Sequence, residues 1–153
     1  MKHTKSRNGF TLIELIIVMV ILGIMAAVAV PRYLDSISNA EESAEDAVIS
    51  SIRAGLTQHA NNSLYENGRA EWPTNPFDAL SEKPAGYSDD GAQANVDGEW
   101  TFYYTDRTGS MVISHQRADN SRYEWKYDLG TQNTLDADGA VIGTLGPRVK
   151  VSP

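Results

Sequence analysis

A run of apolar residues at positions 10–30 constrains the fold of this chain more than any other sequence feature. Glu14 is the only ionisable side chain within it. An α-helix of this length spans about 30 Å, which is the thickness of the hydrocarbon core of a bilayer. A charge at the centre of a membrane-spanning helix costs roughly 2.5–3.5 kcal/mol. The run therefore predicts a membrane-spanning helix, and Glu14 indicates a function that requires a charged partner.

Three interpretations of this run are open. It is a permanent transmembrane anchor, a secretory signal peptide cleaved after Ala29, or a helix that is retained after cleavage between Gly9 and Phe10. The small residues before the Ala29 bond suit a signal peptidase. However, signal-peptide cores have about 7–15 residues and are uncharged. The length of the run and the presence of Glu14 therefore disfavour the signal peptide.

The residues around Gly9 favour the third interpretation. A short leader with three basic residues precedes the string GFTLIE at positions 9–14; these are Lys2, Lys5 and Arg7. The string resembles the class III signal of type IV pilins and type II secretion pseudopilins. The resemblance implies that a prepilin peptidase removes residues 1–9 and methylates the new amino terminus of Phe10. It also implies that Glu14 pairs with the terminal amine of a neighbouring subunit, which would offset part of its burial cost.

The charges of the chain predict the orientation of the run and disfavour one class of partner. Basic residues precede it and acidic residues follow it, which places the amino terminus in the cytoplasm and the globular part in the periplasm. The chain carries a net charge of −7. Without the three leader cations, 10 basic residues remain against 20 acidic ones, which gives −10. Such a domain repels phosphate backbones, so we expect no general nucleic-acid binding.

Two residues are predicted weak points of the apolar helix. Pro31 removes one backbone hydrogen bond and predicts a kink, and Gly23 lowers helix propensity by roughly 1 kcal/mol relative to alanine. The family resemblance implies that the stretch between them can melt and extend during assembly. Alternatively, both are ordinary residues of a membrane helix, where glycine and proline are frequent.

Residues 31–67 are predicted to continue this helix in amphipathic form. One apolar stripe is expected to pack on a sheet, and it comprises Ile37, Ala44, Val48, Ile52 and Leu56. The opposite, solvent-facing side is expected to hold Glu41, Glu42, Glu45, Asp46 and Arg53. The asparagine pairs indicate that the helix ends between Asn61 and Gly68.

A loop and then a sheet are predicted after the helix. Residues 68–98 read as a loop that Trp72, Phe77 and Tyr87 pin onto the core. Residues 99–104, 110–115 and 122–128 alternate with period two, which predicts an antiparallel meander. Weaker strand signals follow at Val141, Ile142 and Val149. The fold class is therefore α+β, with a long helix packed on a C-terminal antiparallel sheet over residues 99–153, as in the pilin fold.

Metal binding and catalysis have little support. Asp136 and Asp138 precede a glycine, as in calcium loops that some pseudopilins hold, but the twelfth residue of an EF-hand register would be Pro147 rather than glutamate. A solvated turn is the favoured interpretation, so we expect no cofactor, with calcium as the one candidate. No catalytic motif is present, and His115 is interpreted as a packed residue. Because the chain has no cysteine, the fastening of its C-terminal tail is unexplained.

The sequence thus predicts a structural subunit of a type IV pilus. The expected partners are identical subunits in a helical filament, prepilin peptidase, the pilus assembly platform and minor pilins. The expected location is the bacterial inner membrane before assembly and an extracellular pilus afterwards. A type II secretion pseudopilin or a minor pilin is the alternative within the family, and a bitopic membrane-anchored sensor or binding module is the alternative outside it. An intact Met1 in the mature protein would favour the sensor, whereas methylated Phe10 would favour the filament.

Overall fold

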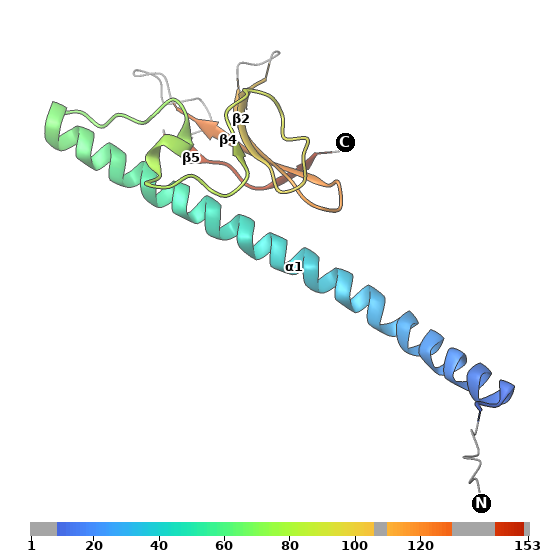
Figure 1. Cartoon of the computed structure of the whole chain (residues 1–153). Helices are drawn as coiled ribbons and strands as arrows, with labels where there is room; N and C mark the ends of the chain where they lie inside the picture. Colours follow the sequence, from blue (N-terminus) through green and yellow to red (C-terminus); the bar gives the residue numbers. More distant parts are fainter. Residues whose placement is uncertain (1–8, 106–109, 130–142, 152–153) are drawn as a thin grey trace, which may run out of the picture. The chain divides into compact units, whose positions relative to one another are not determined.

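The computed structural model describes residues 9–105, 110–129 and 143–151. The chain divides into two compact units, residues 1–43 and 44–153. Helix α1 (Leu12–Asn67) contributes residues to both units (Figure 1). The two units are described separately below.

In the first unit, α1 presents an almost uninterrupted apolar surface. Its side chains from Leu12 to Leu34 are exposed on every side of the helix. The helix is long and apolar enough to cross a membrane by length and composition. Pro31 lies inside α1, which continues on both sides of it. The predicted kink at Pro31 and the predicted melting between Gly23 and Pro31 stay predictions.

In the second unit, α1 buries one face, which we call the docking face. Its members recur every three or four residues, as expected for one side of an α-helix; they are Glu45, Ile49, Ile52, Leu56, Ala60 and Ser63. The predicted stripe is correct at Ile52 and Leu56. It is wrong at Ala44, which is exposed, and it omits Ile49, which is buried.

The prediction that Glu45 faces solvent is also wrong. Its side chain is 0% exposed, because it lies one turn before Ile49 on the docking face. The predicted end of the helix is confirmed. α1 ends at Asn67, and Gly68 follows with φ of 71° and donates its N–H to the Leu64 carbonyl at 3.0 Å. Glycine is favoured there because a left-handed backbone conformation terminates the helix.

The docking face packs on a six-stranded sheet. The strands are β1 (Tyr87–Ser88), β2 (Trp100–Tyr104), β3 (Met111–Gln116), β4 (Arg122–Asp128), β5 (Thr144–Leu145) and β6 (Val149–Val151). Their order is β1-β2-β3-β4-β5, and β6 also pairs with β4. The predicted meander is confirmed as β2, β3 and β4, which pair antiparallel. The α+β class is confirmed as well.

Residues 68–98 contain more structure than the predicted loop. A 3₁₀ helix, η1 (Pro76–Ala79), and strand β1 both form there, and β1 pairs parallel to β2. The sheet is therefore mixed rather than wholly antiparallel. The short length of β1 explains why period-two alternation could not reveal it. Of the weaker strand signals, Val149 lies in β6, whereas Val141 and Ile142 lie outside the described residues.

Aromatic side chains make up much of the core between the helix and the sheet. Trp100, Phe102, Trp125 and Tyr127 are each 6% exposed or less, and they pack with the apolar residues of the docking face. Phe77 is 0% exposed, and Trp72 and Tyr87 are partly buried against the same core. The prediction that these three aromatic residues pin the loop onto the core is therefore confirmed.

The C-terminal segment, residues 143–151, is fastened without a disulfide. β5 and β6 both pair with β4, and Leu145 enters the core. Arg53 on α1 donates to the carbonyls of Leu145 and Gly146, each at 3.5 Å. Gly143 has a φ of 76° and lies so close to the Trp72 indole that a Cβ atom would overlap it. Because these contacts come from the helix, the loop and the sheet, the tail is held by the whole unit.

Replacing Gly55 with alanine is expected to destabilise the second unit. Glycine to alanine in a helix normally stabilises by up to about 1 kcal/mol. Here the added Cβ would lie 2.5 Å from the Ala79 carbonyl oxygen of η1, which is backbone and cannot rotate away. We expect a loss of about 1–3 kcal/mol in the free energy of unfolding, measured by urea denaturation. Ser50→Ala, at an exposed position of the same helix, is the control and should be near neutral.

Candidate functional site

The N-terminal motif forms a reciprocal hydrogen-bond pair at the start of α1. The backbone N–H and the hydroxyl of Thr11 both donate to Glu14 Oε2 at 2.8 Å. The backbone N–H of Glu14 donates to Thr11 Oγ1 at 3.3 Å. A threonine before the first helical residue with a glutamate three positions later is a capping box, which satisfies backbone donors that the first turn leaves free.

This pair gives Glu14 a local role that the sequence analysis did not consider. The string Thr11-Leu12-Ile13-Glu14 contains the spacing of a capping box, so the signal was present. Gly9 and Phe10 precede α1 in non-helical backbone, and Phe10 is 91% exposed. Among the described residues, the peptide bond between Gly9 and Phe10 is therefore exposed and accessible to an enzyme. The predicted intersubunit role of Glu14 and the predicted cleavage and methylation stay predictions.

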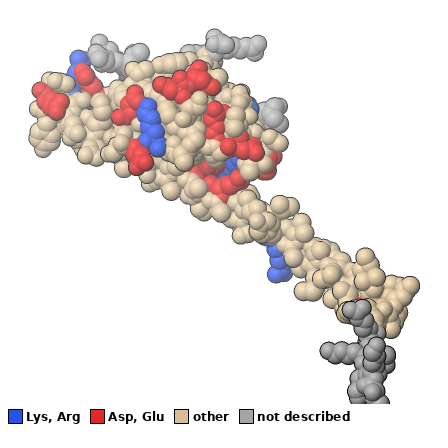
Figure 2. All heavy atoms as spheres, in the orientation of Figure 1, with Lys and Arg blue, Asp and Glu red and all other residues tan. Residues whose placement is uncertain are grey.

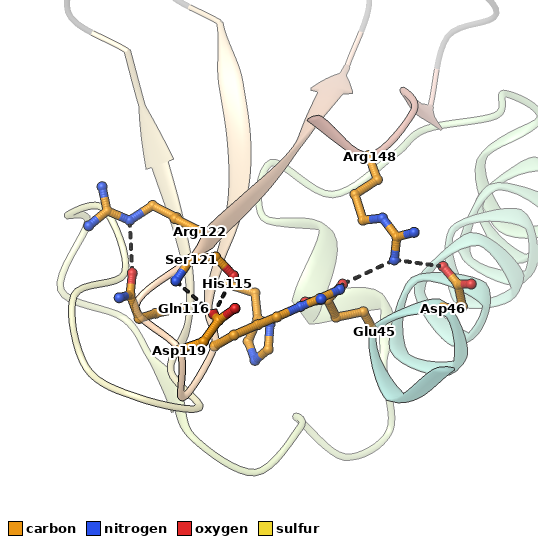
Figure 3. A network of polar contacts seen from close by, with 9 residues as sticks. Glu45, Asp46, His115, Gln116, Asp119, Ser121, Arg122 and Arg148 are labelled. Carbon is orange, nitrogen blue, oxygen red and sulfur yellow. Dashed lines mark hydrogen bonds and ion pairs between the residues drawn. The ribbon is translucent and has the colours of Figure 1, made fainter. Parts of the chain in front are cut away.

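A second constellation lies buried in the globular unit. We call it the Glu45 cluster, and it comprises Glu45, His115, Arg117 and Arg148 (Figure 3). Its members come from α1, from β3 and the residue that follows it, and from the connection between β5 and β6. The cluster therefore joins the helix, the middle of the sheet and the C-terminal segment at one carboxylate.

The geometry around the Glu45 carboxylate satisfies both oxygens. Arg117 donates in a bidentate manner, from Nε to Oε1 and from Nη2 to Oε2, each at 2.6 Å. His115 Nδ1 lies 2.9 Å from Oε1, and Arg148 Nη1 donates to Oε2 at 3.2 Å. Such paired arginine–carboxylate contacts are among the strongest hydrogen bonds in proteins. The buried charge is thus compensated by neighbouring cations.

Aromatic rings hold the cations of the cluster in place. The Arg117 guanidinium lies 4.0 Å from the centroid of the Tyr123 ring, and the Arg148 guanidinium lies 5.6 Å from it. The His115 ring stacks on Trp100 with centroids 4.2 Å apart. Cation–π contacts and stacking restrict the rotamers of these side chains. The Glu45 carboxylate therefore lies among side chains that ring contacts with Tyr123 and Trp100 of the sheet also hold.

The environment of Glu45 changes its pKa strongly. Burial by itself raises the pKa, but the hydrogen bonds and charges of Arg117 and His115 outweigh burial and lower it from 4.5 to about 2. The interpretation of His115 as a packed residue is confirmed, because it is 8% exposed and stacked. The sequence analysis missed that it contacts Glu45. The sequence did contain one signal for this contact. Glu45 lies one helical turn before a series of apolar residues that share one face of the helix.

The lowered pKa predicts how stability depends on pH. The ionised form of Glu45 is favoured in the folded state, so its contribution to the free energy of unfolding is present above pH 4.5 and is lost as pH falls from 4.5 towards 2. We expect the difference in unfolding free energy between the wild type and Glu45→Gln to shrink as pH falls below 4.5. Urea denaturation at several pH values measures it. A difference that grows as pH falls below 4.5 would contradict the assignment.

Metal ligands do not gather in the part of the chain that the structure describes. No group of three or more histidine, aspartate or glutamate side chains there has the arrangement of a metal site. Asp136 and Asp138 lie outside the described residues. The calcium candidate therefore stays a prediction, to be tested by whether calcium raises the melting temperature of the wild type but not of Asp138→Ala.

Comparison with known proteins agrees with the N-terminal geometry. The prokaryotic N-terminal methylation motif matches residues 4–30, which include Gly9, Phe10 and the capping box. The chain is 50% identical over 47 residues to the type IV narrow pilus major component PilA5 of Thermus thermophilus, covering 31% of this chain and 40% of that protein. No solved structure matches the chain significantly.

Other relatives are pilus proteins as well. The chain is 39% identical over 69 residues to a fimbrial protein of Neisseria meningitidis, covering 45% of this chain and 37% of that protein. It is 30% identical over 120 residues to a type IV major pilin protein PilE1 of Neisseria gonorrhoeae, covering 78% of this chain and 49% of that protein. The chain thus spans less than half the length of each of these relatives. The motif and the relatives confirm the resemblance to the type IV pilin family.

Proposed function

We propose that this chain, which carries the N-terminal motif of type IV pilins, is a structural subunit of a type IV pilus. The observation that carries the proposal is the methylation motif at the start of a helix whose apolar side chains are exposed on every side. Such a surface is not stable in water. It requires lipid before assembly and neighbouring apolar helices afterwards.

Assembly follows from the chemistry of the first residues. Cleavage after Gly9 creates a charged amine on Phe10, four residues before Glu14. The capping box holds the Glu14 carboxylate through Oε2, which leaves a net negative charge at the start of α1. The amine of a neighbouring subunit then supplies the opposite charge inside an apolar filament core, where the attraction is strong. Head-to-tail contacts of this kind do not close, so they produce an open helical fibre.

The precursor and its partners complete the proposal. The precursor lies in the bacterial inner membrane with its amino terminus in the cytoplasm, as the basic leader indicates. Prepilin peptidase cleaves it and methylates Phe10, and an assembly platform with minor pilins incorporates it into the fibre. The proposed function includes no catalytic step by this chain. The acidic residues on the globular unit suit an extracellular surface that does not bind nucleic acid in general (Figure 2).

One experiment distinguishes the proposed pilus subunit from its alternatives inside and outside the family. Filaments are sheared from cells that express the chain, imaged, and their main protein is identified by mass and by its N-terminal residue. A main protein that begins at methylated Phe10 supports the proposal. Absence of the chain from abundant sheared filaments favours a minor pilin or a type II secretion pseudopilin. A mature protein that retains Met1 contradicts filament assembly and favours the membrane-anchored sensor or binding module.

A further inference from the structure

Two charges of opposite sign lie on α1 close to the end of its apolar run. Arg32 follows Pro31 directly, and Asp35 lies three residues further on. Both residues belong to the first unit, and both side chains are exposed. Residues three apart on a helix are close enough to pair. Within the described part of the chain, however, neither side chain makes a hydrogen bond or an ion pair.

The surroundings of these two charges change when copies of the chain assemble. The neighbouring side chains of Val28, Val30 and Leu34 are apolar and exposed. In the proposed fibre α1 packs against the α1 helices of other copies, so these side chains lose their contact with water. A charge among them loses water as well, and it is stable there only beside a charge of opposite sign.

The charge pair proposed at the amino terminus sets the level of a neighbouring copy. If the Phe10 amine of one copy pairs with Glu14 of the next, the two chains are displaced by four residues, about 6 Å along a helix. The same displacement brings Arg32 of the first copy to within one residue of the level of Asp35 in the second. Because all copies share one backbone conformation, this relation does not depend on the backbone between the two places.

Glu14, Arg32 and Asp35 also lie on one side of α1. Arg32 follows Glu14 by 18 residues, which is about five whole turns of an α-helix. Asp35 follows Glu14 by 21 residues, which is about one sixth of a turn less than six turns. The side of the helix that presents Glu14 to a neighbouring copy therefore presents the other two charges as well.

We propose that Arg32 of one copy pairs with Asp35 of the next copy in the fibre. The inference rests on the proposed function and adds a second contact to the same interface. The partner is a second copy of this chain, because each copy carries one cation and one carboxylate at complementary levels. A guanidinium can donate two hydrogen bonds to one carboxylate, which fixes their relative positions. Each copy donates to one neighbour and accepts from the other, so the contact runs head to tail.

Charge reversal on two co-expressed chains tests the pairing between copies. Arg32→Glu and Asp35→Lys each bring like charges together at every contact between copies, and each also does so within its own chain. When both variants are present, the reversed charge of one chain can meet the reversed charge of the other, and their native charges can meet too. Opposite charges then face each other only between different chains, so a recovery cannot arise within one chain.

The measurement is the amount of each chain in sheared filaments at equal precursor level, with the chains distinguished by mass. We expect either variant by itself to give at least about tenfold less filament than the wild type, because like charges meet at every contact. Co-expression should restore filaments that contain both chains. Glu66→Lys is the matched control partner, because it alters an exposed residue of the same helix and changes the net charge as Asp35→Lys does. It should incorporate less of the Arg32→Glu chain.

Three results would overturn the proposal. They are wild-type amounts of filament from either single variant, equal incorporation of Arg32→Glu with both partners, and a loss with Arg32→Glu that Asp35→Lys does not relieve. The third result would assign Arg32 to lipid phosphate in the precursor membrane. Each of them leaves the proposed function intact, provided that the wild-type chain forms filaments that begin at Phe10. If the wild type forms none, the proposed function and this inference both fail.

Discussion

Replacing Glu45 with alanine is expected to lower the free energy of unfolding of the globular unit by about 3–5 kcal/mol. The loss has two causes. Arg117 and His115 would remain buried and lose the Glu45 carboxylate that accepts their hydrogen bonds, and Arg148 of the C-terminal segment would lose its contact with the same carboxylate. Since small domains are stable by only about 5–15 kcal/mol, this change removes a large part of the total. Urea denaturation followed by tryptophan fluorescence measures it.

Asp46→Ala is the matched control for this prediction. Asp46 is the next residue of the same helix, its side chain is 69% exposed, and its carboxylate lies 3.8 Å from Arg148 Nη1. Exposed ion pairs of this kind contribute at most about 1 kcal/mol. Similar losses for the two variants would show that the buried position of Glu45 is irrelevant, which would contradict the role assigned to the cluster.

Replacing Glu14 is expected to abolish filament assembly, and the choice of substitution identifies the reason. Glu14→Gln keeps an oxygen that can accept the Thr11 N–H, because glutamine also completes a capping box. It removes only the negative charge. If the charge pairs with the Phe10 amine of a neighbour, both Glu14→Gln and Glu14→Ala should prevent assembly. The measurement is the amount of sheared filament per cell at equal precursor level.

Thr11→Ala separates capping from charge in the opposite way. It removes the hydroxyl of the capping box, at a cost of about 0.5–2 kcal/mol in helix stability, but leaves the Glu14 charge in place. We expect reduced but detectable assembly. If Glu14→Gln produced as much filament as the wild type, the charge-pairing hypothesis would be contradicted. Capping would then be the only role of Glu14.

Features that depend on local pattern could be predicted from the sequence. The apolar run, the end of α1 at the Asn67-Gly68 pair and the strands β2, β3 and β4 each follow from the order of a few neighbouring residues. Strand β1 could not be predicted, because two residues have no periodicity and pair only with a partner distant in sequence. η1 was also missed, although it has local signals: Asn75 caps it by accepting the Phe77 N–H, and Pro76 is its first residue.

The Glu45 cluster shows most clearly where pattern reasoning fails. A glutamate in an acidic helix segment is normally solvated, so the prediction placed it outside. Its burial depends on Arg117 and Arg148, which lie 72 and 103 residues further along the chain. Sequence patterns relate only neighbouring residues, so they cannot predict contacts between such distant positions. Glu14 and Thr11, in contrast, are three residues apart, and their capping-box spacing can be recognised in the sequence.

The sequence by itself determined the N-terminal methylation motif and the apolar helix within it, because that signal consists of consecutive residues. It also determined the α+β class, since periodicity is a property of each element alone. Only the tertiary structure decided which further residues of α1 join Ile52 and Leu56 against the sheet, how the cysteine-free C-terminal segment is fastened, and that a charge lies in the core. These depend on contacts between residues far apart in the chain, where a buried carboxylate is stable only because the fold brings its cations to it.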